Sequence, residues 1–325
     1  MLLNKAMAAD ETEFPRGYTD EVREILLTLL ADPDPDLDRD QPAEGMAGHG
    51  DPVQVAINSV RPMALNAFIT FTWWTTADTD PEPDSALLDV IEDRITDDHS
   101  LAVRSVIGRR FRTLWAFDQD RTEAWLEDIF PRGDTLRDQR RFIAAWNSFV
   151  RNHVLWEAYD DLLPYYRHAI ELLDTAEFDA YELAVRPTAA HVVSSYLFGD
   201  ESLTNDTSLI RQFYTAASPD DAKEVAVTIA NGIENPDVKN QWEPIVDLWD
   251  WRLYQLESIN GTVEQAHATE VRQFLECVRD CPGTDLADEQ DLVRRSLPFV
   301  ASGTRHWRQI EAWLAEQADA DQPLL

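Results

Sequence analysis

"FIAAWNSFVRNHVLWEAYDDLLPYYRHAIELL", residues 142–173, decides the fold class, because its apolar residues recur at the spacing of an α-helix. On a helical wheel of about 100° per residue, Trp146 lies near the middle of an apolar arc that also includes His153. The second half repeats the pattern, with Trp156 and Tyr166 on its apolar side. We expect two helices whose aromatic rings and His153 lie in the core. The alternative for the rings is a groove between helices.

Helical periodicity continues along the chain, and the alternating pattern of a strand is nearly absent. Residues typical of helix starts precede several apolar stretches: Thr19, Asp51, Ser85, Ser100 and Ser218. Further helices are expected over residues 121–130, 136–153, 156–174, 177–198, 207–217, 237–258, 262–280, 288–300 and 304–318. We therefore predict an all-α fold in which antiparallel helix pairs stack side by side as an irregular α-solenoid-like array.

Proline and aspartate gather in two stretches, residues 31–52 and 77–85, which we expect to be loops. The predicted organisation is an N-terminal helix with an acidic linker over residues 1–50, a helical repeat-like domain over residues 51–318, and a frayed tail over residues 319–325. Pro62 interrupts an apolar helical stretch, where it is expected to cause a kink.

The charge is strongly acidic, with 61 Asp and Glu against 28 Lys and Arg and a net charge of -33. Lysine occurs only at Lys5, Lys223 and Lys239. Such a surface suits a cell at molar salt, where a Debye length of roughly 3 Å screens self-repulsion. We expect a cytoplasmic protein of a halophile. Binding to nucleic acid is disfavoured, because phosphate contacts weaken steeply with salt.

Cys277 and Cys281 are predicted to be free thiols, because a lone C-x3-C lacks the further ligands that a metal site needs. The most apolar run, "MALNAFITFTWWTTA", is too short and too polar to cross a bilayer. The N-terminal residues lack the apolar segment of a signal peptide. No membrane association is expected.

Sequence motifs of nucleotide, zinc and hydrolase sites do not occur in the chain. We expect no catalytic residue, no cofactor and no metal, and hence no enzyme. An enzyme that uses carboxylates and arginine in a helical groove is the less favoured alternative.

Arg110 differs from its neighbours in "LAVRSVIGRRFRTLWAF", because it falls on the apolar side while Arg104, Arg109 and Arg112 fall on the outer side. A buried guanidinium needs a carboxylate or a bound anion. We predict a carboxylate from an adjacent helix, with an anion site as the alternative. A third hypothesis is an arginine-lined scaffold that contacts nucleic acid, built on Arg104, Arg109, Arg112, Arg137, Arg140 and Arg141.

Trp251 stands opposite the apolar face of "WEPIVDLWDWRLYQLE", close to Tyr254. A neighbouring helix covers such a tryptophan, or it is left for a partner, since aromatic residues are enriched at interfaces. Trp251, Tyr254 and Arg110 are the candidate partner-binding residues.

Three stretches together resemble the C-terminal helical region of large prokaryotic STAND-type NTPases associated with antiphage defence: "DPVQVAINSVRPMALNAFITF", "LAVRSVIGRRFRTLWAFDQDRTEAWLEDIFP" and the stretch quoted first. The resemblance covers about residues 51–175 well, with Pro62 where a glycine is expected, and it has a looser echo at "WEPIVDLWDWRLYQLE". It implies a non-enzymatic recognition module that senses a phage protein or acts with an NTPase or effector encoded elsewhere. The chain is then expected to be a split gene product, a remnant or a separate subunit.

Overall fold

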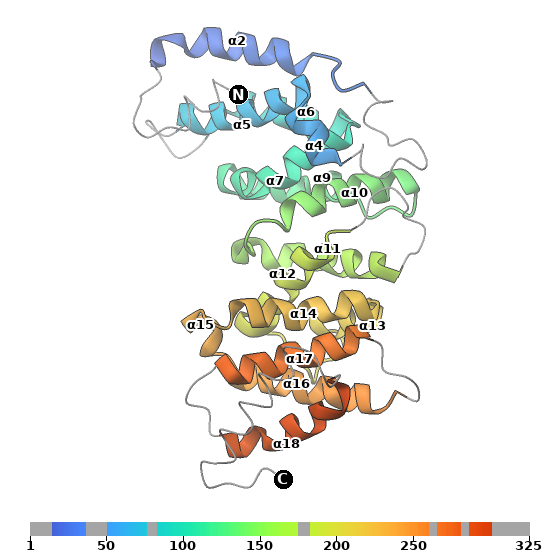
Figure 1. Cartoon of the computed structure of the whole chain (residues 1–325). Coiled ribbons are helices and arrows are strands. Elements are labelled where there is room, and N and C mark those ends of the chain that lie inside the picture. Colours follow the sequence, from blue (N-terminus) through green and yellow to red (C-terminus); the bar gives the residue numbers. More distant parts are fainter. Residues whose placement is uncertain are drawn as a thin grey trace. The chain divides into compact units, whose positions relative to one another are not determined.

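The computed structural model describes residues 15–36, 51–76, 83–174, 183–259, 265–280 and 286–300. Within these ranges every regular element is helical and no strand occurs, which confirms the predicted all-α fold (Figure 1). The contacts divide the chain into two compact units, residues 1–184 and 185–325. The predicted linker up to residue 50 and the tail from residue 319 fall largely or wholly outside the described residues.

The described part of unit 1 is built from α-helices and short 3-10 helices around an apolar core. Its α-helices are α2 (Thr19–Leu30), α4 (Pro52–Ile57), α5 (Val60–Thr76), α6 (Ser85–Asp97), α7 (Leu101–Phe117), α8 (Gln119–Ala124), α9 (Leu126–Ile129), α10 (Leu136–Phe149) and α11 (Tyr159–Glu171). Short 3-10 helices are η1 (Arg16–Tyr18), η2 (Trp156–Ala158) and η3 (Leu172–Asp174).

Three of the predicted helix starts are confirmed by the hydrogen bonds at the caps. The side chains of Asp51, Ser100 and Ser218 accept from backbone N–H groups of the following turn at 3.0, 3.2 and 3.3 Å. At α6, however, the capping residue is Asp84, and Ser85 is already helical. A side-chain oxygen at this position satisfies an N–H group that has no partner within the helix.

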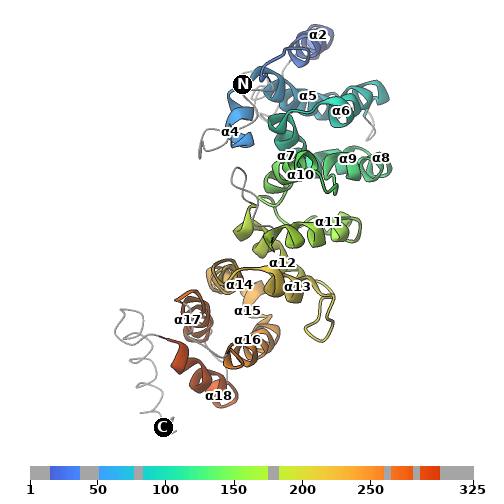
Figure 2. The same ribbon diagram turned by 90° about the vertical axis from the view of Figure 1, so that its right-hand side faces the viewer.

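Helices α5 and α7 run in the same direction, because Arg110 reaches Asn66 near the start of α5 while Phe117 stacks on Trp73 near its end. Helices α7 and α10 also run in the same direction, because Gly108 approaches Ala145 while Phe111, further along α7, contacts Phe149 at the end of α10. The returning segments α6 and α8–α9 make these parallel neighbours possible (Figure 2). Antiparallel pairing, which we predicted throughout, holds in unit 1 for α10 and α11, where Phe142 contacts His168 and Trp146 contacts Tyr166. It also holds for α2 and α5, because Arg16 before α2 reaches Trp74 near the end of α5 while Asp34 after α2 reaches Val60 at its start.

Trp146 is fully buried, as predicted, and its ring lies 4.9 Å from that of Tyr166 on α11. Two neighbours of the same stretch were predicted wrongly. Helix α10 ends at Phe149, so His153 lies in an exposed connection and not on a helical core face. Trp156 belongs to a 3-10 turn and is 44% exposed.

Pro62 does not kink a helix, because α4 ends at Ile57 and α5 begins afresh at Val60. A proline is tolerated in the first turn, where its missing N–H group has no intrahelical partner. Asp34, which follows α2, caps this new helix. Its carboxylate accepts from the Val60 N–H at 2.8 Å, and its carbonyl accepts from the Arg61 N–H at 2.9 Å.

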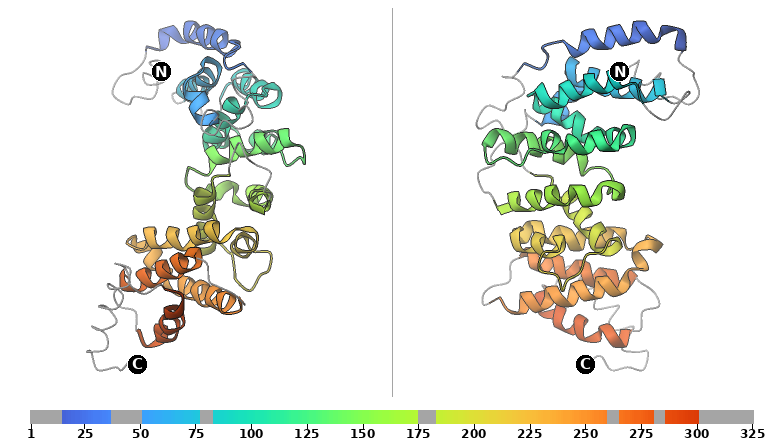
Figure 3. Two further views of the ribbon diagram at one scale, coloured as in Figure 1. Left: turned by 45° about the vertical axis from the view of Figure 1, so that its right-hand side comes forward. Right: turned by 180° about the vertical axis from the view of Figure 1, so that it is seen from behind.

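Unit 2 contains α12 (Val185–Phe198), α13 (Leu209–Ala216), α14 (Pro219–Gly232), α15 (Pro236–Lys239), α16 (Trp242–Glu257), α17 (Gln265–Asp280), α18 (Leu286–Ser296) and η4 (Leu297–Phe299). Helix α14 packs extensively on α12 and on α17. Figure 3 shows α16, α17 and α18 in orange to red.

Helices α16 and α17 are antiparallel, since Trp249 stacks on Phe274 while Arg252 pairs with Glu270 at 2.8 Å. Cys277 on α17 is a buried thiol and not part of a disulfide, as predicted, whereas Cys281 lies outside the described residues. The side-chain packing of this helix pair fixes the outward face of α16, which carries the candidate site.

Candidate functional site

Arg110 does not meet the carboxylate that we predicted. Its Nε donates to Asn66 Oδ1 at 2.7 Å and its terminal nitrogen to Thr70 Oγ1 at 3.1 Å, and no described carboxylate pairs with it. Burial, together with the charge of Arg109, lowers the pKa of Arg110. Two neutral oxygens on α5 thus satisfy a partly buried guanidinium, which makes Arg110 a structural contact between α5 and α7.

Arg104 is the arginine of α7 that is fully buried, contrary to the prediction that it faces outward. It donates to the backbone carbonyls of Asp98 at 2.8 Å and Asp128 at 2.7 Å. Burial and the nearby Arg141 charge lower the pKa of Arg104 to about 9. Because Arg104 faces the interior, the six arginines proposed as a nucleic-acid surface do not share one exposed face.

Trp251 and Tyr254 are brought together on α16, in unit 2. Helix α13 covers part of Trp251, with the Tyr214 ring at 5.5 Å and the Arg211 guanidinium at 5.7 Å from the indole ring. The uncovered part of Trp251 remains accessible, and Tyr254 is 70% exposed. Trp251 is therefore partly covered by a neighbouring helix and partly accessible, so each of the two alternatives holds for a part of its ring.

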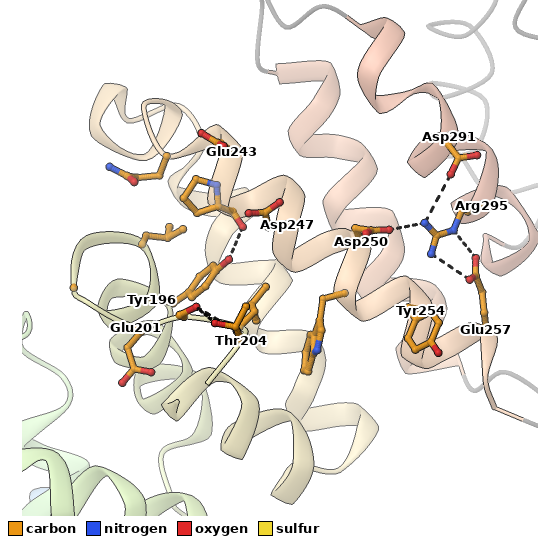
Figure 4. Close-up of a pocket in the computed structure, with 17 residues that line it drawn as sticks. Tyr196, Glu201, Thr204, Glu243, Asp247, Asp250, Tyr254, Glu257, Asp291 and Arg295 are labelled. Carbon is orange, nitrogen blue, oxygen red and sulfur yellow. Dashed lines mark hydrogen bonds and ion pairs between the residues drawn. The ribbon is translucent and has the colours of Figure 1, made fainter. Parts of the chain in front are cut away.

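A hollow of about 1000 Å³ lies beside these two rings and is here called the α16 groove. It is lined by α16, by the end of α12 with residues 199–204, and by Asp291 and Arg295 of α18 (Figure 4). Both candidate residues of unit 2 line it, whereas Arg110 belongs to unit 1.

The exposed face of α16 forms one continuous stripe along the groove. It consists of Glu243, Asp247, Asp250, Tyr254 and Glu257, which follow each other at intervals of three or four residues. That spacing places side chains on a single face of a helix. Four carboxylates and one phenol therefore line the same wall.

Arg295 closes one end of the stripe. Its guanidinium donates to Glu257 at 2.8 and 3.1 Å and to Asp250 at 2.5 Å, and Asp291 lies at 3.8 Å. The bidentate bond to Glu257 is the geometry that guanidinium and carboxylate groups favour. Arg295 is thus neutralised by its own helices.

Glu243 and Asp247 at the other end of the stripe make no hydrogen bond or ion pair with any described residue. Partial burial and the charges of Glu243 and Asp250 raise the pKa of Asp247. Across the groove, the Tyr196 hydroxyl donates to the Pro244 carbonyl at 2.8 Å, and burial raises the pKa of Tyr196. The groove therefore holds negative charge that no cation among the described residues of unit 2 offsets.

The sequence reasoning missed the opposite wall, formed by Tyr196, Glu201 and Thr204. These residues come from α12 and the connection after it, and no pattern in the sequence places them next to α16. The stripe itself could have been found, because a helical wheel over residues 242–257 puts its five members together.

A second hollow, of about 890 Å³, lies in unit 1 between α11 and residues 127–138. Its Arg132 pairs with Glu127 and stacks over the Tyr165 ring at 4.8 Å. Its lining carries charges of both signs, four carboxylates against Arg132 and Arg167. Within the described ranges, no group of three or more His, Cys, Asp or Glu side chains is arranged to hold a metal ion.

No protein-family model, curated protein or solved structure matches this chain. The resemblance to the helical region of STAND-type NTPases stays a prediction. Among the described residues, no helix has the length and apolar character needed to cross a membrane.

Proposed function

We propose that the chain is a non-enzymatic helical recognition module that binds a protein partner through the α16 groove. The observation that carries this proposal is that Trp251 and Tyr254 line the same hollow and that both are at least partly accessible. Aromatic side chains at the centre of an interface contribute a disproportionate share of the binding energy. Tyr254 in particular is 70% exposed, so burial of its ring contributes little to folding.

The charges of the groove favour the binding of a protein over the two alternative functions, catalysis and the binding of nucleic acid. An enzyme that uses carboxylates and arginine needs an arginine that is free to bind the substrate, but Arg295 of the groove is already held by three carboxylates. A nucleic acid would bring its phosphates against the acidic stripe, where like charges repel. A protein surface has no such conflict.

The resemblance described above supplies the biological setting of this proposal. In that setting the module acts in the cytoplasm beside an NTPase or effector encoded elsewhere, and its partner is that protein or a protein of an invading phage. The α16 groove lies outside residues 51–175, where the resemblance is good, and its helix α16 has only the looser echo of it.

An affinity purification from native cells, infected and uninfected, tests the proposal. The tagged chain is compared with Tyr254→Ala and with Trp251→Ala/Tyr254→Ala, and Trp156→Ala serves as the control, because Trp156 is a partly exposed aromatic residue of unit 1. We expect a specific co-purifying protein that persists with Trp156→Ala and is lost from both groove variants. Equal recovery with all four folded chains would refute the proposal.

A further inference from the structure

The α16 groove shows how this chain binds its own arginines. Arg295 is held by Glu257 and Asp250, and Arg211 lies over the Trp251 ring at 5.7 Å while it pairs with Asp206 at 2.7 Å. A carboxylate together with an aromatic face is a favourable environment for a guanidinium group. The walls of the groove thus have the chemistry of a cation site.

Two carboxylates of the stripe, Glu243 and Asp247, have no cation beside them among the described residues. Glu243 and Asp247 are one helical turn apart and exposed, and they have no ion-pair partner among the described residues, while Tyr254 is exposed further along the same face. Asp250 lies between them and is engaged by Arg295 from one side. An incoming positive side chain would find two free carboxylates next to accessible aromatic surface.

We infer that the α16 groove binds a basic peptide segment of its partner, with arginine or lysine side chains directed at Glu243 and Asp247 and further apolar or basic side chains against Tyr254 and Trp251. This inference rests on the proposed function and names the chemistry of the partner. Charge complementarity selects it, because the stripe is acidic along its length and has accessible rings within it.

The spacing of the stripe fits a segment with basic residues at regular intervals. Glu243 and Asp247 are about 6 Å apart along the helix axis, and Asp247 and Tyr254 about 10 Å apart, at 1.5 Å per residue. Alternate side chains of an extended strand lie about 6.6 Å apart on one side. An extended segment with a basic residue at every second position therefore matches the two carboxylates.

High salt weakens the ionic part of this recognition, as it weakens phosphate contacts, and leaves the stacking on the aromatic rings. At molar salt the Debye length is about 3 Å, so long-range attraction is screened. Recognition then depends on direct contact and stacking, which the geometry of the groove provides.

Fluorescence anisotropy with a labelled peptide that alternates arginine with serine tests the inference on the full chain, at low and at molar salt. The same peptide with citrulline in place of arginine keeps the shape of the side chain and removes its charge. The variant Glu243→Gln/Asp247→Asn neutralises the two free carboxylates. Asp160→Asn/Asp161→Asn in unit 1 removes the same charge elsewhere and is the matched control.

We expect the groove variant to lower the affinity for the arginine peptide by about tenfold or more, the control to change it less than about twofold, and the citrulline peptide to bind about tenfold more weakly. Equal losses in both variants would show attraction to net charge alone and would overturn the inference. So would equal binding of the citrulline peptide.

The proposed function can stand when this inference fails. If the natural partner is lost with Tyr254→Ala but retained with Glu243→Gln/Asp247→Asn, the groove is a recognition site for a partner that is not basic. If neither variant affects the partner, the proposed function itself is wrong.

Discussion

Trp146 is the largest fully buried side chain of the stretch that decides the fold. Its ring contacts Phe142 at 5.5 Å, Phe149 at 5.4 Å and Tyr166 at 4.9 Å between ring centroids. Truncation of such a side chain loses burial and leaves a cavity that close-packed neighbours fill only in part.

We predict that Trp146→Ala lowers the free energy of unfolding by about 3 to 5 kcal/mol. Trp156→Ala, ten residues along the same stretch and 44% exposed, is the control and should cost far less. Denaturant unfolding of both variants at molar salt gives the comparison. Equal losses would mean that Trp146 does not hold the core of unit 1 together.

Buried tyrosines make the stability sensitive to alkaline pH. Burial raises the pKa of Tyr166 and of Tyr214 well above the ordinary value, and it also raises the pKa of Tyr165 and Tyr196. The folded chain therefore keeps these protons at a pH where the unfolded chain, with a pKa of about 10, loses them. Their contribution is complete below pH 10 and is lost as the pH rises through the folded-state pKa.

We predict a cooperative unfolding transition above about pH 10. Tyrosinate absorbance and helical circular dichroism, recorded together at molar salt, should change in the same pH range. Gradual ionisation of all tyrosines with the helical signal intact would show that these hydroxyl groups are not protected by the fold.

Helices α7 and α10 approach so closely that only a glycine fits between them. A Cβ atom added at Gly108 would lie 2.0 Å from the carbonyl oxygen of Ala145, which is a backbone atom and cannot rotate away. The two helices would have to separate, at the cost of the contacts between Phe111 and Phe149.

We predict that Gly108→Ala destabilises unit 1 by about 3 kcal/mol, the upper end of the usual cost of overpacking. Gly232→Ala is the matched control, because the nearest atom to its added Cβ is Val238 Cγ2 at 3.5 Å, an ordinary contact. It should be neutral or slightly stabilising, since alanine favours a helix. The two melting curves, measured side by side, decide whether the helix contact is as close as described.

Helix periodicity and capping residues could be read from the sequence because both depend on neighbours within a few positions. Asp51, Ser100 and Ser218 were predicted on this basis and cap their helices. Contacts between distant segments could not be read in this way. Arg104 turns inward because two carbonyls, of Asp98 and Asp128, happen to receive it.

The residues of the candidate site also differ in whether the sequence could identify them, for the same reason. Trp251 could be identified from the sequence because it lies opposite the apolar face of α16, and Tyr254 because it is close to Trp251 on that helix. Both residues line the groove. Tyr196 and Thr204 of the opposite wall are joined to α16 by tertiary packing alone. Arg110 was correctly predicted to face an adjacent helix. Its neutral partners Asn66 and Thr70 were not predicted, since the sequence does not show which residues of α5 lie opposite.

The whole chain has a net charge of -33. Self-repulsion of this charge opposes the compact state, and salt screens it. We predict that the melting temperature rises steadily from low to molar potassium chloride. Sucrose at equal osmolality is the control for exclusion of cosolvent from the surface and should raise it much less. A melting temperature that does not respond to the salt would contradict the expected adaptation to a saline cytoplasm.

Hydrogen exchange of the chain with and without its co-purified partner tests most directly whether the α16 groove is the recognition surface. We predict slower exchange over residues 199–208 and over α16 when the partner is bound, no change in α10 and α11 of unit 1, and no slowing for the Tyr254→Ala variant mixed with the same partner. Slower exchange confined to unit 1, with the segments of the groove unchanged, would contradict the assignment.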